Sequence, residues 1–309
     1  MHVSSKVRAA LHGKTLLDYL STRYTYLPPE VWQQLLQDGK ISCQGVIVRD
    51  EARVVAKNDL IGTELPDFKP PAVNFDYTIV YEDEWLLAIN KPAGLRVHSS
   101  GKFATANLIY HLRHLHHPAY PAANLVNRLD ADTSGLVLLA KEKSILGHLM
   151  RQFADGRVDK RYLAVVTGRP DPDCGVIDLP IGPVRGARVP RFWIDQAKGR
   201  AAVTRYKTVS ALDNDDTLLE LHPETGRTHQ LRVHLAAIGH SIAGDALYSM
   251  NDNDYLNHHR TPPTPGILQR QTLHSLQLQF FHPGLKTICT LTAPLASDIE
   301  QYIQSRSKK

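Results

Sequence analysis

The stretch Asn127-Arg128-Leu129-Asp130-Ala131-Asp132-Thr133-Ser134-Gly135-Leu136 leads directly into the apolar run at 136–141. A short apolar run bounded by turn residues predicts a buried strand. The polar residues before it predict a tight turn, which places Asp130 on a rigid loop at the start of that strand. Such a carboxylate can act as a nucleophile, a general base or a metal ligand. It can also do no more than accept hydrogen bonds within its own turn.

Strand-like runs surround this stretch on both sides and outnumber the long helical patterns. We expect strands at 78–81, 85–89, 136–141, 161–166, 202–209, 218–221, 272–280 and 287–291. We expect helices at 106–117, 144–153 and 228–238. Many strands with few long helices favour an α+β fold with a mixed, mainly antiparallel sheet and flanking helices.

The first 65 residues have a different pattern and predict a separate small α+β domain. Leu16, Leu17 and Leu20 form one helix face, and Pro28-Pro29 opens a second helix that stops at Gly39. Short strand-like runs follow. This order resembles the S4-type RNA-binding module, although the basic residues here are scattered among acids instead of gathered on one helix. We therefore predict an S4-like RNA-binding domain at 1–65 and a Pro-rich linker at 66–76, followed by a catalytic domain at 77–309.

Composition excludes several classes of protein. The chain of 309 residues is 42% hydrophobic and 22% charged, which is typical of a folded domain and not of a disordered one. No apolar run approaches the length of a membrane span, and residues 1–14 lack the apolar core of a secretory signal. Three scattered cysteines indicate neither a disulfide framework nor a CxxC metal site, so we expect a cytoplasmic protein. The net charge of +5 is compatible with a polyanionic partner.

The second informative stretch is Glu224-Thr225-Gly226-Arg227-Thr228-His229-Gln230-Leu231-Arg232-Val233-His234-Leu235. Thr228 is the expected helix cap, and Arg227 then lies at the helix N-terminus, where anions are favoured. The expected buried stripe consists of Leu231, Leu235 and Ile238. Side chains outside this stripe, which need not point into the core, are His229, Arg232 and His234. A solvated surface helix is the alternative, but the concentration of donors in one turn argues against it.

Two further stretches suggest contacts with RNA. Tyr162 lies in the basic strand Lys160-Arg161-Tyr162-Leu163-Ala164-Val165, where it can stack on a base. The segment 185–207 carries basic residues, including Arg191 and Arg200, mixed with aromatic ones. Such a mixture suits single-stranded or looped RNA, although a solvated loop is the alternative. The spacing of His111 and His114 is ligand-like, but no cysteine or acid lies nearby, so no metal site is predicted.

With the stretch Asn90-Lys91-Pro92-Ala93-Gly94-Leu95-Arg96-Val97-His98, these motifs occur in a specific order. Together they resemble the RluA-type family of RNA pseudouridine synthases over residues 78–294. The resemblance implies a pseudouridine-synthase-like sheet and an isomerisation that needs no cofactor and no metal. It implies Asp130 as the nucleophile, Tyr162 against the target base, and Arg227 as the ion-pair partner of Asp130. Three positions depart from the family pattern: Asn127, Ala131 and Ser275.

The resemblance also implies how the substrate is held. The target uridine is flipped out of structured RNA, and Arg128 braces the vacated position. Further residues predicted to bind RNA are Thr133, Lys160, His229, Leu231, Arg191 and Arg200. Ribosomal RNA is favoured over transfer RNA, and no membrane or obligatory protein partner is expected. An RNA N-glycosidase and a non-catalytic RNA-binding or folding factor remain alternatives. Whether Asp130 attacks C1′ or C6, or removes the 2′-proton, stays open.

Overall fold

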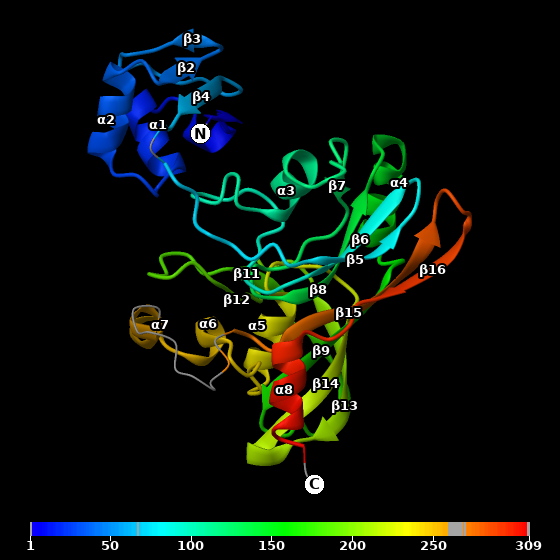
Figure 1. Cartoon of the computed structure of the whole chain (residues 1–309). Helices are drawn as coiled ribbons and strands as arrows, with labels where there is room; N and C mark the ends of the chain where they lie inside the picture. Colours follow the sequence, from blue (N-terminus) through cyan, green and yellow to red (C-terminus); the bar gives the residue numbers. More distant parts are fainter. Residues whose placement is uncertain (1, 67, 259–267, 269, 308–309) are drawn as a thin grey trace. The chain divides into compact units, whose positions relative to one another are not determined.

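A computed structural model describes residues 2–66, 68–258, 268 and 270–307 of the chain (Figure 1). The chain divides into two compact units. The N-terminal unit comprises Met1–Val73 and His98–His111, and the large unit comprises Asn74–Val97 and Leu112–Lys309. The return of His98–His111 to the N-terminal unit is not among the sequence predictions.

The N-terminal unit packs two helices against a small antiparallel sheet. Its elements are β1 His2–Lys6, the 3-10 helix η1 Ala9–Leu11, α1 Leu16–Arg23, α2 Pro29–Gln37, β2 Ile41–Cys43, β3 Val46–Ile47 and β4 Leu60–Glu64. The strand order is β1-β4-β2-β3. Thr15 caps α1, because its side-chain oxygen accepts a hydrogen bond from Asp18 N at 3.1 Å. Tyr19 of α1 and Trp32 of α2 are fully buried in its core. The two helices and the following short strands agree with the sequence prediction, whereas β1 was not predicted.

The large unit is built on a ten-stranded sheet, which confirms the predicted α+β class with a mixed, mainly antiparallel sheet. The path of the sheet is β10-β13-β14-β9-β15-β8-β6-β5, with β16 paired to β15 and β7 to β8. The strands are β5 Thr78–Glu82, β6 Leu86–Lys91, β7 Asn124–Leu125, β8 Ser134–Ala140, β9 Asp159–Thr167, β10 Cys174–Asp178, β13 Val203–Ala211, β14 Asp216–Pro223, β15 Leu273–His282 and β16 Thr287–Thr292.

The remaining elements of the large unit lie around this sheet. A separate two-stranded sheet joins β11 Ile181–Pro183 to β12 Phe192–Ile194. The helices are α4 Lys143–Ala154, α5 Gln230–Ala237, α6 Ala246–Ser249, α7 Asp252–His258 and α8 Ser297–Gln304, together with the 3-10 helix η2 Asp213–Asp215. The helix α3 Leu108–His114 spans the division between the two units.

Strand β8, which follows the Asp130 turn, is buried along its whole length, as the apolar run predicts. It pairs antiparallel with β6 and parallel with β15 (Figure 1). At the parallel contact Gly135 has a φ of +106°, and a Cβ there would lie 2.2 Å from the Ser275 carbonyl oxygen. Only glycine permits this approach of the two strands. It fixes the start of β8, and therefore the Asp130 turn, against β15.

Two helices cover the sheet through apolar faces. Ile145 and Leu149 of α4 pack with Leu136 and Leu138 of β8. Leu231 and Leu235 of α5 pack in a second cluster with residues of β9 and β14. Helix α3 is shorter than the predicted 106–117, and α5 begins two residues later than predicted. Among the described residues, no helix has the length and apolarity needed to cross a bilayer.

Candidate active site

Asp130 lies in the turn between β7 and β8, and side chains from distant parts of the chain brace this turn. Thr133 N donates to the Asp130 carbonyl oxygen at 3.3 Å, which closes the turn. The bracing hydrogen bonds run from Lys91 Nζ to Ala131 O at 2.8 Å, from Arg270 Nη1 to Asp132 O at 3.1 Å, and from Gln271 Nε2 to Thr133 Oγ1 at 3.2 Å. All three donor residues are buried. The turn is therefore held rigidly, as the sequence predicts.

The guanidinium that pairs with Asp130 belongs to Arg232 of α5. Arg232 Nη1 lies 3.1 Å from Asp130 Oδ2. The same guanidinium donates two hydrogen bonds to Asp245, from Nε to Oδ2 at 2.6 Å and from Nη2 to Oδ1 at 2.8 Å. Arg232 is 7% exposed and Asp245 1%. Burial disfavours the charged guanidinium, but the hydrogen bonds and charge of Asp245 and the charge of Asp130 outweigh it and raise the pKa of Arg232. The buried Asp245 thus orients a permanent cation toward Asp130.

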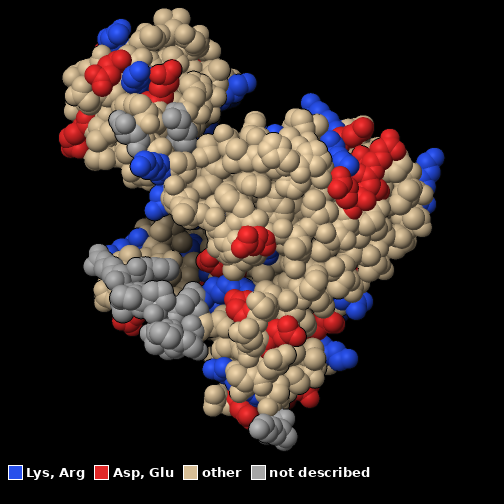
Figure 2. All heavy atoms as spheres, viewed as in Figure 1, with Lys and Arg blue, Asp and Glu red and all other residues tan. Residues whose placement is uncertain are grey.

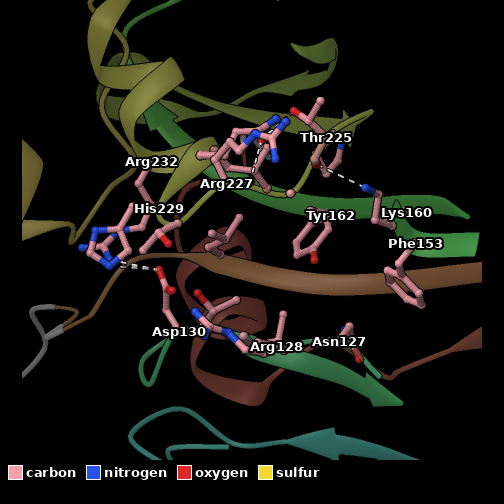
Figure 3. A pocket seen from close by; sticks show the side chains of 18 of the residues that line it. Asn127, Arg128, Asp130, Phe153, Lys160, Tyr162, Thr225, Arg227, His229 and Arg232 are labelled. Atoms are coloured by element: carbon pink, nitrogen blue, oxygen red, sulfur yellow. Dashed lines mark hydrogen bonds and ion pairs between the residues drawn. The ribbon is translucent and has the colours of Figure 1, made fainter. Parts of the chain in front are cut away.

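The prediction that Arg227 pairs with Asp130 is therefore wrong. Arg227 Nε donates to the carbonyl oxygen of Ala201 at 2.8 Å, just before β13. Arg227 lies in the loop before α5, where the Ala201 carbonyl oxygen holds its guanidinium. Arg232 is inside the helix and faces the Asp130 turn. Arg227 still lines the same pocket (Figure 3).

His229 occupies the position before α5 in a left-handed conformation, with φ 57° and ψ 19°. A non-glycine residue there is strained by about 1–3 kcal/mol, and such strain is often found at functional sites. The strained backbone directs the ring toward Asp130, with His229 Nε2 3.8 Å from Asp130 Oδ2. The expected cap at Thr228 is not formed, because His229 is the N-cap residue and α5 has no side-chain cap.

The hydrogen bonds of His229 favour one tautomer. Phe192 N donates to the Tyr248 hydroxyl oxygen at 3.2 Å, and that hydroxyl lies 2.7 Å from His229 Nδ1. Because the Tyr248 oxygen accepts from Phe192, its own proton is available for Nδ1. Burial lowers the pKa of His229, against the opposing charge of Asp130, which favours a neutral ring. A neutral ring that accepts at Nδ1 carries its proton on Nε2, beside Asp130.

Helix α5 is more deeply buried than its apolar stripe predicts. His234 is fully buried, and its two ring nitrogens lie 3.0 Å from Thr204 Oγ1 and 2.9 Å from Leu179 O. Gln230 accepts hydrogen bonds from Arg227 N and Thr225 Oγ1, which organises the loop before the helix. Polar side chains can therefore face the core when the fold supplies their hydrogen-bond partners. Arg232 and His234, which from their position outside the apolar stripe need not point into the core, are both buried.

A pocket of about 460 Å³ opens beside Asp130. Figure 3 shows Asp130 and His229 at one end of it and Lys160 and Phe153 at the other, with Tyr162 between them. Burial raises the pKa of Tyr162, so its phenol stays protonated. The pocket brings together eight predicted site residues: Asp130, Tyr162, Arg227, Arg128, Thr133, Lys160, His229 and Leu231.

Lys160 is the buried cation at the far end of the pocket. Its Nζ donates to the carbonyl oxygens of Thr225 at 3.2 Å and Glu224 at 3.5 Å. Burial lowers the pKa of Lys160 to about 8. Lys160 therefore anchors the loop that carries Arg227 while it contributes a donor to the pocket wall.

Two predicted RNA-binding residues, Arg191 and Arg200, are not among the residues that line the pocket. Arg191 forms an ion pair with Asp252 of α7. Arg200 is exposed, and its backbone pairs with Ile181. The positive charge of the segment 185–207 is therefore partly neutralised by acids elsewhere in the fold.

No sequence pattern indicated the pairing of Arg232 with Asp245 or the contacts made by Tyr248, Gln230 and Lys91. Arg232 and Gln230 lie in the motif at 224–235, and Lys91 lies in the motif at 90–98. Their position within these motifs was the sequence feature that could have identified them. Asp245 and Tyr248 lie beyond the motifs, and nothing in their neighbourhood marks them. Among the described residues, no group of three or more His, Cys, Asp or Glu is placed to hold a metal ion.

Comparison with known sequences gives a consistent result. Residues 85–237 match the family model described as RNA pseudouridylate synthase. The chain is 36% identical over 277 residues to ribosomal large subunit pseudouridine synthase D of Zymomonas mobilis, covering 85% of this chain and 84% of that protein. It is 31% identical over 303 residues to ribosomal large subunit pseudouridine synthase C of Vibrio cholerae, covering 94% and 92%.

Solved structures with the same architecture include two human proteins. Human RNA pseudouridylate synthase domain containing 4 aligns with a TM-score of 0.53 at 27% identity, over 73% of this chain and 92% of that one. Human RNA pseudouridylate synthase domain containing 1 aligns with a TM-score of 0.54 at 25% identity, over 77% and 99%. The fold of this chain is therefore similar to that of two proteins described as containing an RNA pseudouridylate synthase domain.

Proposed function

This chain belongs to the RNA pseudouridylate synthase family and is an isomerase that converts uridine to pseudouridine in RNA; we propose that it acts on ribosomal RNA with Asp130 as its nucleophile. The choice of ribosomal over transfer RNA is supported by the relatives in Zymomonas mobilis and Vibrio cholerae, both described as ribosomal large subunit pseudouridine synthases. We expect it to act in the cytoplasm.

One observation carries the assignment of Asp130. It is the carboxylate of a braced turn that opens into the pocket, paired at 3.1 Å with a guanidinium that Asp245 holds in place. In the reaction the N1–C1′ bond of uridine breaks, the base turns, and a C5–C1′ bond forms; the proton on C5 leaves and N1 takes up a proton. The carboxylate attacks C1′ or C6, or removes the 2′-proton. Each route needs an anionic oxygen at a fixed position, which this arrangement supplies.

The pocket supports a flipped-out target nucleotide. Its volume of about 460 Å³ lies within the range of about 300–1,000 Å³ found for small-ligand sites. Extrusion of a stacked base costs a few kcal/mol, which contacts inside the pocket must offset. Tyr162 offers a face for stacking on the uracil. Arg128 is an exposed side chain at the rim, where it can brace the gap left in the RNA. Arg227 and Lys160 add positive charge to the wall.

The N-terminal residues 1–65 are proposed as an S4-like RNA-binding domain, joined through 66–76 to a catalytic domain at 77–309. Two helices followed by a small sheet support the resemblance. The exposed cations of this domain would add affinity for a large structured RNA.

The direct test is the variant Asp130→Asn. It should lose tritium release from RNA that contains 5-labelled uridine while it still binds that RNA. Full turnover by this variant would exclude Asp130 as the nucleophile. The matched control is Asp132→Asn, which alters the neighbouring acid of the same turn.

Analysis of the reaction products separates the alternatives. An N-glycosidase would release free uracil, whereas an isomerase leaves the RNA mass unchanged. A non-catalytic RNA-binding factor predicts that Asp130→Asn changes no RNA modification. Carbodiimide mapping of pseudouridines in ribosomal and transfer RNA, from cells with and without the gene, would identify the target.

A further inference from the structure

A second cavity, of about 980 Å³, lies between α4 and the β15–β16 hairpin. We call it the α4–β16 groove, defined by His148, Arg151, Arg157, Phe281, Lys286 and Ile288 among the residues that line it. None of these residues lines the pocket beside Asp130. The groove is a separate surface of the large unit, and the proposed chemistry does not use it.

The groove and the active-site pocket share two walls. On α4, Gln152 lines the groove and its neighbour Phe153 lines the pocket. On β9, Asp159 lines the groove and Lys160 the pocket. Phe153 and Lys160 mark the end of the pocket away from Asp130 (Figure 3). This end of the pocket and the groove therefore adjoin the same two elements, α4 and β9.

The charge of the groove is one-sided. Helix α4 contains no acidic residue, and neither does the stretch 277–292 on the opposite wall. Arg151 and Lys286 are exposed cations, with the exposed ring of His148 beside them, whereas the exposed Arg157 is paired with Asp155, which directly follows α4. Asp159 is the one acid among the described lining residues, and it is paired with Arg161 at 3.3 Å. The face in Figure 2 carries basic and acidic side chains together, with the largest group of acidic ones at the upper right.

Apolar side chains are exposed between these cations. Phe281 is 45% exposed and Ile288 61%. Exposed aromatic and aliphatic side chains next to cations are typical of surfaces that bind single-stranded RNA, because bases stack on the apolar groups while phosphates meet the cations. A protein partner would use the same apolar groups, but the lack of acidic residues in α4 and in the stretch 277–292 favours a polyanion.

The walls of the groove are held firmly. Gln152 exchanges two hydrogen bonds with the backbone of Phe281, at 2.8 Å and 2.9 Å, which ties α4 to β15. His282 Nδ1 accepts from Gly284 N and Leu285 N, and its Nε2 lies 2.9 Å from Asp83 Oδ2. The turn that carries Lys286 is therefore fixed to the sheet. A fixed surface loses little conformational freedom on binding.

We propose that the α4–β16 groove binds a strand of the substrate RNA that continues from the target uridine out of the pocket. This inference rests on the proposed function, since it takes RNA as the substrate. The groove acts through phosphate and stacking contacts, so it contributes affinity and orientation and not chemistry. A strand bound there sets the direction in which the RNA enters the pocket.

The test uses the full-length protein and a fluorescein-labelled 20-nucleotide oligouridylate, with affinity measured by anisotropy across a range of salt concentrations. Arg151→Glu and Lys286→Glu should each weaken binding severalfold, and the double variant about tenfold. The slope of log affinity against log salt should fall by about 1.4 for the loss of two single-strand phosphate contacts. The matched control is Lys143→Glu, an exposed lysine of the same helix that does not line the groove, and it should change affinity less than twofold.

Equal affinity of the double variant and the wild type at every salt concentration would overturn the proposal. An equal loss in Lys143→Glu would also overturn it, since the effect would then reflect net charge alone. Thermal melting verifies that the variants fold, which is expected because both side chains are exposed. Failure of the proposed chemistry is distinguishable, because it would appear as turnover by Asp130→Asn and would leave these affinities unchanged.

Discussion

Lys91 is a fully buried lysine whose charge should control how the stability of the fold depends on pH. It is 0% exposed, and its Nζ donates to the carbonyl oxygens of Pro92 at 2.7 Å and Ala131 at 2.8 Å. Burial, partly offset by the charge of Asp132, lowers the pKa of Lys91 from 10.5 to about 7. The folded protein therefore binds fewer protons at this site than the unfolded chain between pH 7 and pH 10.5. Stability must rise with pH in that window.

The size of the effect follows from the shift. The difference between the pKa of Lys91 in the folded and the unfolded state destabilises the fold by about 5 kcal/mol below pH 7, where Lys91 is charged in both states. Raising the pH from 7 to 9 should recover about 2 kcal/mol, because the folded site is then neutral while the unfolded lysine is still protonated. Lys91→Met shortens the side chain by its terminal atom only and removes the ionisable group. Its stability should therefore lack this increase.

The assay is urea unfolding at pH 6, 7, 8 and 9. The difference in unfolding free energy between wild type and Lys91→Met should change by about 2 kcal/mol from pH 7 to pH 9 in favour of the wild type. Lys160, whose pKa is about 8, contributes in the same direction, but it is present in both proteins and cancels. The exposed Lys143→Met is the control and should parallel the wild type. Parallel curves for Lys91→Met and wild type would refute the buried-charge reasoning.

The remaining predictions concern the active site. Arg232→Ala should lower the free energy of unfolding by about 3–5 kcal/mol in urea, because Asp245 becomes a buried unpaired charge. The double variant Arg232→Ala/Asp245→Ala should recover part of this loss, because it removes that charge. Arg227→Ala should weaken RNA binding and leave the pH profile of turnover unchanged, because the ion-pair partner of Asp130 is Arg232. A shifted pH profile in this variant would contradict that pairing. His229→Gln should retain more activity than His229→Asn in a single-turnover assay, because the glutamine amide reaches the position of Nε2 and the asparagine amide that of Nδ1. Greater activity of the asparagine variant would contradict the assigned tautomer.

The local sequence pattern was sufficient to predict most strands of the large sheet and the turn that carries Asp130. Five apolar residues after a Thr-Ser-Gly turn can hardly form anything but a buried strand, and β8 is buried throughout. The same reasoning located Tyr162 on β9. Both predictions depend on residues close together in the sequence, for which local propensity is a good guide.

The ion pair could not be predicted, because Arg227 and Arg232 stand in the same motif and long-range contacts decide which of them faces Asp130. Asp245 orients the guanidinium of Arg232, whereas Arg227 donates to the Ala201 carbonyl oxygen. The left-handed conformation of His229, which directs its ring toward Asp130, is not marked by any sequence pattern either. The bracing of the turn by Lys91 and Gln271 is equally hidden, since it joins segments far apart in the chain.

Asp130 and Arg232 are separated by 102 positions, and Gln271 reaches the same turn across 138. A fragment that ends before α5 would contain Asp130 without Arg232, and without Arg270 and Gln271, which brace the Asp130 turn. Such a fragment can have no functional centre. During synthesis, activity should therefore appear late and in one step, when β15 inserts beside β8. A split chain should regain turnover only if its two pieces reassociate, so enzymatic assay would report directly on assembly of the whole sheet.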